Sequence, residues 1–413
     1  MSNRPRTIRS APDVYNHASA SNGRACDRRR IVWTIPTLTY WGSLGLIAYT
    51  YGGYPALLLG LSKLKKIARQ GALRPVEPPV EPTVSVVLAA HNEQGRIAAK
   101  LDNLLSLDYP KEKLEIVVVS DGSTDETDAI VESYADRGVS LERNETPQGK
   151  AVALNRGVAR ASGELLLFCD ARQRIDPQAL RRLVSWFADP NIGAVSGELQ
   201  LDTGKGPGAY WAYERLIRNA ESAIDSVVGA TGALYALRRH LYRDLPADCL
   251  LDDVFTPMQI VLQGYRVTID SEAKVYDDEA SVKGEFSRKA RTLAGNYQLL
   301  QQLPELLDPR KNRLFLQLVS HKLLRLACPF ALVTLFSSNA YLVLTAAPGW
   351  PVYATTLAGQ LVGYGLAAKA LLLGDEKAGK LTKLSQTFVT LNAAAVEGLR
   401  RFVKGELSWT SGR

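Results

Sequence analysis

Cysteine and histidine are scarce and scattered in this sequence. Each occurs only four times among 413 residues, and no two cysteines form a Cys-x-x-Cys pattern. A disulfide framework or a zinc site needs such residues at close, regular spacing. The sequence therefore argues against both, and we expect free thiols in a reducing compartment.

Aromatic residues are missing from the basic clusters. The formal net charge is +8, arginines crowd residues 4–30, and Lys63, Lys65 and Lys66 follow the first apolar segment. Surfaces that bind single-stranded nucleic acid place aromatic side chains among the basic ones. We therefore expect no nucleic-acid partner. Basic clusters beside apolar segments are typical of contacts with anionic lipid head groups.

Charge is absent from residues 31–61, which are mostly apolar. About 20 apolar residues suffice to cross a bilayer, so this stretch is predicted to be a transmembrane helix, with a buried core helix as the alternative. Gly52, Gly53 and Pro55 are expected to kink or end it. Residues 1–30 have no apolar run, so we predict a disordered basic tail rather than a signal peptide.

The C-terminal part of the chain is also rich in apolar residues. Residues 308–326 are predicted to form an amphipathic helix in the membrane interface, and residues 327–373 to form two transmembrane helices. Residues 374–413 hold a basic loop, a segment at 384–398 that is either a third C-terminal span or an interfacial helix, and a tail. The lysines of the loop favour its placement in the cytoplasm.

Between these segments lies a stretch of alternating strand-like and helix-like character. It covers residues 83–307 and follows a basic, proline-rich linker at residues 62–82, so an α/β domain is expected. Three apolar runs in it lead directly into polar or acidic residues. The runs are Val84–Ala90, Glu115–Val119 and Glu164–Cys169, followed by His91–Glu93, Ser120–Ser123 and Asp170. Ligands of open α/β sheets bind beyond such strand ends, which indicates a nucleotide site.

The order of short motifs in this stretch resembles an inverting family 2 glycosyltransferase of the GT-A fold, a Rossmann-like mixed sheet. The motifs are Ala-Ala-His-Asn-Glu at 89–93, Ser-Asp-Gly-Ser-Thr-Asp at 120–125, Gly-Lys-Ala at 149–151, Asp-Ala-Arg at 170–172, Leu-Asp-Asp-Val at 251–254 and Arg-Lys-Ala-Arg-Thr at 288–292. Each motif alone is a weak signal, but together their order and spacing are specific. The flanking apolar helices resemble those of bacterial polysaccharide synthases.

The resemblance implies roles for the first motifs in holding a nucleotide. Asp121 accepts from the base, Glu93 and the backbone around Ala90 line the base and ribose, and Lys150 lies near base or phosphate. An ordinary turn and helix cap is the alternative for residues 121–125, and a solvated lysine is the alternative for Lys150.

Asp170 is the metal ligand that the resemblance implies. Carboxylate oxygens suit Mg²⁺ or Mn²⁺ bound to a diphosphate. The family usually has Asp-x-Asp here, whereas this chain has Arg172 at the third position. Arg172 can instead pair with phosphate.

The remaining motifs concern catalysis and the acceptor. Inversion needs a base. The family has an acidic pair, then a short helix, then Gly and an aromatic residue, so the resemblance implies Asp253 as the base, with Asp252 as its acidic neighbour and Gly264-Tyr265 after the helix. A helix-capping pair is the alternative. The resemblance also places Thr231 and Gly232 beside the acceptor, and Arg288 and Arg291 near the diphosphate, unless those arginines face lipid head groups. Thr292 replaces the family's Trp, which weakens the case for a processive polymer channel.

The function that follows is sugar transfer in exopolysaccharide or envelope glycan synthesis. We expect a nucleotide-sugar donor, chiefly a UDP-sugar, and a growing glycan or lipid-linked acceptor. The chain is expected in the plasma (inner) membrane as a multi-pass protein. Its catalytic domain is placed in the cytoplasm, because nucleotide sugars are made there. The alternatives are a single-sugar transferase to a lipid carrier and a nucleotide-binding scaffold without activity.

Overall fold

The computed structural model describes residues 18–68, 81–201, 209–277, 282–373 and 379–407. The chain divides into two compact units. One comprises Met1–Ile47 and Phe330–Gly365, and the other comprises Ala48–Pro329 and Leu366–Arg413. Each unit is described by itself.

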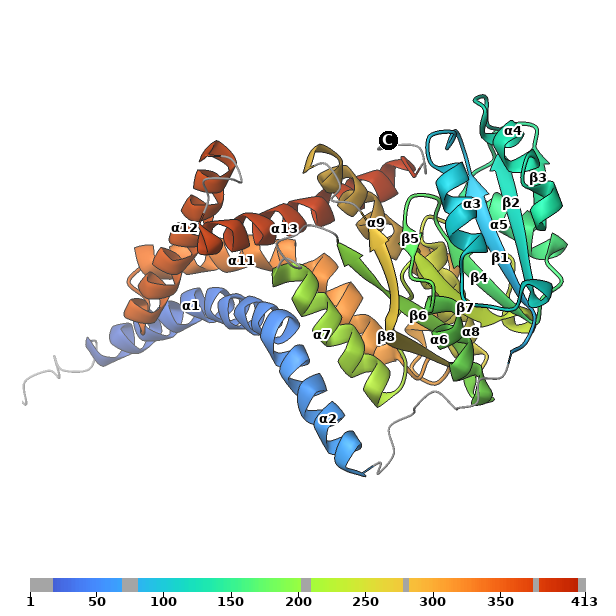
Figure 1. Ribbon diagram of the computed structural model, residues 1–413. Helices are drawn as coiled ribbons and strands as arrows, with labels where there is room; N and C mark the ends of the chain where they lie inside the picture. Colours follow the sequence, from blue (N-terminus) through green and yellow to red (C-terminus); the bar gives the residue numbers. More distant parts are fainter. Residues whose placement is uncertain (1–17, 69–80, 202–208, 278–281, 374–378, 408–413) are drawn as a thin grey trace, which may run out of the picture. The chain divides into compact units, whose positions relative to one another are not determined.

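The larger unit contains one eight-stranded sheet with the strand order β3-β2-β1-β4-β7-β6-β8-β5 (Figure 1). The strands are β1 (Val84–Ala90), β2 (Leu114–Asp121), β3 (Val139–Asn144), β4 (Leu165–Cys169), β5 (Arg174–Ile175), β6 (Ile192–Leu201), β7 (Leu234–Arg238) and β8 (Arg266–Asp277). Neighbours among β3, β2, β1 and β4 are parallel, whereas β7 is antiparallel to β4 and β6, and β5 is antiparallel to β8. The predicted mixed sheet is confirmed.

Helices cover both faces of this sheet. Along β1, Val84, Val86 and Leu88 belong to one buried core, while Val87 belongs to the other, as the two-residue period of a strand requires. The first core includes residues of α3 and α6, and the second includes residues of α5, α8 and α9. Because β1 is buried on both faces, it is a continuous apolar run rather than an alternating one.

The helices of the larger unit connect the strands and extend beyond the sheet (Figure 1). They are α2 (Tyr54–Ala68), α3 (Ile97–Leu105), α4 (Thr127–Glu132), α5 (Lys150–Arg160), α6 (Ala179–Ser185), α7 (Ala209–Ile224), α8 (Asp252–Leu262), α9 (Val282–Gln302), α10 (Phe315–Leu318) and α13 (Lys380–Lys404). Helix α13 packs on α9, where Gly398 permits close approach because a Cβ there would lie 2.9 Å from the backbone nitrogen of Ala294.

The smaller unit contains most of α1 (Ala18–Ala48) with parts of α11 (Leu324–Leu344) and α12 (Trp350–Leu373). Its core centres on Tyr40, which is fully buried and lies edge-on to Tyr353 at 4.8 Å between ring centroids. The Tyr40 hydroxyl is 2.9 Å from Thr356 Oγ1. Polar groups between these apolar helices are therefore hydrogen-bonded to one another.

Two helical stretches in the described residues are long and apolar enough to cross a membrane. They are Trp33–Lys65 and Phe315–Leu344. The first overlaps the predicted span at 31–61, and the second overlaps the first half of the predicted pair at 327–373. The number of spans stays a prediction, as does membrane insertion itself.

The structure differs from the sequence predictions at the edges of these helices. Helix α1 begins at Ala18 rather than near Ile31, so part of the predicted tail is helical, and residues 1–17 lie outside the described part. A π-helical turn at Tyr49–Gly53 interrupts the regular helix close to the predicted kink. Residues 308–326 are no separate amphipathic helix, because α10 passes through a π turn at Val319–Leu323 directly into α11.

Candidate active site

The loops that follow β1 and β2 are fastened to one another. Backbone N–H groups of the first loop donate to side chains of the second. In the opposite direction, the Thr124 N–H donates to Asn92 Oδ1 at 2.8 Å. The donors and acceptors are Asn92 N to Ser123 Oγ (3.1 Å), Glu93 N to Thr127 Oγ1 (2.8 Å) and Gln94 N to Asp125 Oδ2 (3.1 Å). The polar residues of both motifs thus form one rigid edge beside Ala90.

Glu93 contributes to this edge mainly through its backbone. Its carbonyl accepts from the first turn of α3, while its carboxylate lies 3.4 Å from Arg96. Gly122 has a φ of +64°, and a Cβ there would lie 2.5 Å from the backbone nitrogen of Pro147. Glycine is therefore required at this turn. The nucleotide contacts predicted for Glu93 and Ala90 stay predictions.

Asp121 organises the loop that leads to Lys150. Its buried carboxylate accepts from the side chain of Asn144 at 2.9 Å and from the backbone N–H groups of Gln148 and Gly149 at 2.8 Å each. A carboxylate has about four acceptor positions, so one remains, and the predicted contact of Asp121 with a nucleotide base stays a prediction. No local pattern indicated the role in the loop, since the partners of Asp121 are 23 to 28 residues away.

Lys150, the first residue of α5, links two carboxylates. Its Nζ lies 2.9 Å from Asp170 Oδ1 and 3.2 Å from Asp252 Oδ2, and only 14% of the side chain is exposed. Burial alone would lower the pKa of Lys150, but the charges of Asp170 and Asp252 outweigh it and raise the pKa above its usual range. The alternative of a solvated lysine is wrong.

Asp252 and Asp253 are the first two residues of α8, and the residue in the N-cap position is Leu251. They are therefore not the capping residues of that helix. Asp253 is only partly exposed, and its Oδ2 accepts from the Gly232 backbone N–H at 3.1 Å. Burial, followed by the negative charge of Asp252, raises the pKa of Asp253 to about 6, against the opposing charge of Lys150. A carboxylate with such a pKa suits general base catalysis near neutral pH.

The segment around Gly232 is shaped to hold Asp253. A Cβ at Gly232 would lie 3.2 Å from Asp253 Oδ2, and the Ala230 N–H donates to the Asp253 carbonyl at 2.7 Å. The Thr231 N–H donates to Ser196 Oγ at 3.0 Å. Thr231 and Gly232 therefore lie beside the candidate base. Ser196 was missed from the sequence, because a single serine in a strand carries no motif.

Asp170 fits a divalent ion as a single protein ligand. Its side chain is 39% exposed, but Oδ1 is already close to Lys150. Among the described residues, no group of three or more His, Cys, Asp or Glu side chains could hold a metal. Mg²⁺ keeps several waters and is often bound through one carboxylate with phosphate oxygens. The donor set thus fits such an ion only together with a bound diphosphate.

One of the three arginines predicted to meet the diphosphate has a described protein partner. Arg172 pairs with the buried carboxylate of Asp277 at the end of β8, which also accepts from Gln173 at 3.1 Å. Arg288 and Arg291 lie on α9, the helix that packs against α13. Diphosphate contacts by these three residues stay predictions.

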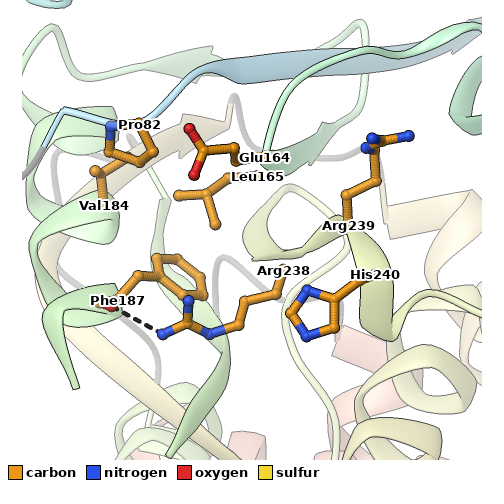
Figure 2. A pocket seen from close by; sticks show the side chains of 8 residues that line it. All are labelled: Pro82, Glu164, Leu165, Val184, Phe187, Arg238, Arg239 and His240. Carbon is orange, nitrogen blue, oxygen red and sulfur yellow. Dashed lines mark hydrogen bonds between the residues drawn. The ribbon is translucent and has the colours of Figure 1, made fainter. Parts of the chain in front are cut away.

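A cavity of about 380 Å³ is lined by Leu165, Arg238 and six other residues (Figure 2). It lies at the start of β4, whereas Asp170 follows the end of that strand. Leu165 begins β4 and is paired with Arg238 at the end of β7, and both line the cavity. The Arg238 guanidinium donates to the carbonyls of Phe187, Asp189 and Ile192 at 2.8 to 3.0 Å. This arginine therefore ties three backbone carbonyls together, and the cavity is separate from the charged cluster around Lys150.

The part of the chain that holds Asp121, Lys150 and Asp170 matches a known family. Residues 85–245 match the family described as Glycosyl transferase family 2. A β-monoglucosyldiacylglycerol synthase of Synechocystis is 30% identical over 197 residues, which cover 44% of this chain and 40% of the relative. A poly-β-1,6-N-acetyl-D-glucosamine synthase of Staphylococcus aureus is 26% identical over 232 residues, covering 52% and 55%. The chain thus spans about half the length of these relatives.

A solved structure is similar over a larger share of the chain. It is a mannosyltransferase from Pyrobaculum calidifontis in complex with GDP-Man and Mn²⁺, with a TM-score of 0.69 and 26% identity. The likeness covers 89% of this chain and 100% of the mannosyltransferase. It therefore extends beyond residues 85–245 into the flanking helices.

Proposed function

Because residues 85–245 form a glycosyl transferase family 2 domain with the GT-A fold, we propose that this chain transfers a sugar from a nucleotide-sugar donor with inversion. The observation that carries the proposal is the cluster of Asp253, Asp252, Lys150 and Asp170 at one end of the sheet. The donor is a UDP- or GDP-sugar, and the acceptor is a growing glycan or a lipid-linked sugar.

Asp253 acts as the base in this proposal. An acceptor hydroxyl attacks the anomeric carbon of the donor, a new C–O bond forms, and the bond from that carbon to the diphosphate oxygen breaks. The hydroxyl proton passes to Asp253, and the nucleoside diphosphate leaves with the bonding electrons. The Gly232 N–H holds one oxygen of Asp253 at 3.1 Å, which keeps the other oxygen directed to the acceptor.

Lys150 stabilises the negative charge that develops on the leaving nucleoside diphosphate. Its ammonium lies between Asp170 and Asp252, so it is already held in place before the donor binds. Fixed charges of this kind stabilise a transition state without reorganisation. Asp170 would hold Mg²⁺ or Mn²⁺ with the donor diphosphate, and that ion would neutralise further phosphate charge.

Membrane attachment completes the proposal. Two described helices are long and apolar enough to cross a bilayer, and basic residues flank the first. By their names, one bacterial relative is a synthase of β-monoglucosyldiacylglycerol and the other a synthase of poly-β-1,6-N-acetyl-D-glucosamine. Both fit a transferase at the cytoplasmic face of the plasma membrane, where nucleotide sugars are available.

Donor turnover tests this function. Purified membranes that carry the chain are offered labelled UDP- and GDP-sugars with Mg²⁺, Mn²⁺ or a chelator. We expect consumption of one donor, lost in Asp253→Asn and kept in the control Asp102→Asn, whose side chain is 56% exposed on α3. Turnover of no donor in membranes that retain their lipids would favour the scaffold alternative. Product length separates single addition from polymer synthesis.

A further inference from the structure

A buried charge network joins α2, α7 and the start of α11 in the larger unit. Glu221 Oε1 accepts from the Tyr54 hydroxyl at 2.7 Å and lies 2.9 Å from His321 Nδ1. Glu214 lies 3.2 Å from His321 Nε2 and pairs with Arg325. Burial opposes ionisation of Glu214, but the hydrogen bond from His321 and the charge of Arg325 outweigh it, so its pKa is lowered. Both carboxylates thus contact His321, and Glu214 also pairs with Arg325.

Lys322 and Arg218 are left over from this pairing. Both are half-buried, and no ion pair joins either one to a carboxylate within the described ranges, although Glu214 is the main charge that acts on Lys322. Arg218 donates to Ser196 Oγ at 3.3 Å, and its positive charge acts on that of Lys322. The charge of Arg218 acts on Glu198 more strongly than that of Arg215, whose Nε lies 3.9 Å from Glu198 Oε1, but burial outweighs both charges and raises the pKa of Glu198.

Arg218 is linked by hydrogen bonds to the segment that holds the candidate base, and the charge of Lys322 acts on that base. Ser196 Oγ, which accepts from Arg218, also accepts from the Thr231 N–H, and the next residue along the chain holds Asp253. The charge of Lys322 also reaches Asp253, where it lowers the pKa against the stronger effect of burial. Arg218 and Lys322 therefore face the region from which an acceptor must approach Asp253.

A cation taken out of water is costly unless an anion meets it. Two adjacent cations repel one another, and a doubly charged phosphate would offset both while accepting charge-assisted hydrogen bonds. The proposed transfer needs an acceptor at this place. We propose that the acceptor carries a phosphate group, held by Arg218 and Lys322 next to the hydroxyl that Asp253 activates. This inference rests on the proposed function and narrows its acceptor class.

The phosphate can belong to a lipid or to a water-soluble sugar. The experiment therefore measures binding of four probes to the full chain in detergent with UDP present. They are farnesyl phosphate, farnesol, glucose 6-phosphate and glucose. We expect at least one phosphate probe to bind about tenfold more tightly than its uncharged partner, a difference of about 1.4 kcal/mol. The probe that shows this preference identifies the source.

Matched variants assign the preference to the two cations. Lys322→Gln and Arg218→Gln are expected to weaken binding of the phosphate probe about tenfold, while Lys322→Arg retains it. Affinity for UDP should stay within about twofold in all three, which also shows that they fold. Arg137→Gln serves as the control, because this arginine pairs with Asp102 on the surface. Donor turnover is measured separately, so failure of the proposed function is seen independently.

Two results would overturn the inference. One is equal affinity of the wild-type chain for each phosphate probe and its uncharged partner. The other is a phosphate preference that Lys322→Gln and Arg218→Gln both retain. If a glutamine variant does not fold, the wild-type comparison of farnesyl phosphate with farnesol, and of glucose 6-phosphate with glucose, still decides.

Discussion

Asp121 and Asp253 are acidic residues at the edge of the same domain, and they differ in how the protein holds them. Asp121 accepts from three donors, all of them in the segment that leads to Lys150. Asp253 accepts from one described donor, the Gly232 N–H, and has Asp252 beside it. Within the described residues, Asp121 thus has three hydrogen bonds that hold its loop, whereas Asp253 has one and keeps an oxygen without a described donor.

An aspartate in a motif can therefore stabilise the fold or take part in the reaction, depending on its hydrogen-bond partners. A carboxylate whose acceptor positions are filled stabilises the chain segment that supplies its donors. A carboxylate with few donors and a like charge nearby holds a proton more readily. The following substitutions test this division.

The largest effect is expected for Asp253→Asn. Removing a general base slows a reaction by about 100-fold to 10,000-fold, and the amide cannot accept the acceptor proton. We expect kcat to fall by at least about 100-fold, with no loss of thermal stability because a partly buried charge is removed. The measurement is donor turnover beside thermal unfolding of the purified chain. Unchanged turnover would contradict the role of Asp253.

Asp121→Asn should act mainly on stability. An asparagine cannot accept from all three donors, so the free energy of unfolding is expected to fall by about 1–3 kcal/mol. Thermal unfolding in detergent measures this change, with Asp102→Asn as the surface control. If stability is unchanged but UDP affinity falls, the carboxylate contacts the nucleotide directly, as the motif resemblance implies.

The fall of kcat/KM at acid pH is expected to reflect the protonation of Asp253. The base must be ionised to act, and its pKa is raised to about 6, so kcat/KM is expected to fall as pH drops through about 6. At pH 5 the ionised fraction, and with it kcat/KM, is about tenfold lower than the plateau. In Lys322→Gln the fall should move to higher pH, because a charge that lowers the pKa of Asp253 is lost. A fall that does not move would place Lys322 farther from Asp253.

The smallest effect is expected for Arg172→Ala. This arginine is 40% exposed and pairs with buried Asp277, which keeps its hydrogen bond from Gln173. Loss of this ion pair should lower the free energy of unfolding by about 1 kcal/mol, a value between those typical of exposed and of buried ion pairs. We expect kcat to be unchanged. A fall in kcat with unchanged stability would instead support the predicted phosphate contact of Arg172.

Much of the fold could be predicted from the sequence because its signals are local. The apolar runs at 84–90, 115–119 and 164–169 became β1, β2 and β4 with nearly the same bounds. Parallel pairing then brings their carboxyl ends to one edge, since Ala90 is paired with Ser120 and Val87 with Phe168. Helix limits were less accurate. The start of α1 and the junction of α10 with α11 depend on packing rather than on local composition.

The residue types at the strand ends can be read from the local sequence: acidic and polar groups follow buried apolar runs and suit a nucleotide site. The pairing of those groups depends on the packed fold. Lys150 meets Asp170 and Asp252, which lie 20 and 102 residues further along the chain, while Asp121 turns to its own loop and Arg172 to Asp277. A local pattern sets the direction of a side chain from a strand or helix, but its partner comes from whichever distant element the core packs beside it.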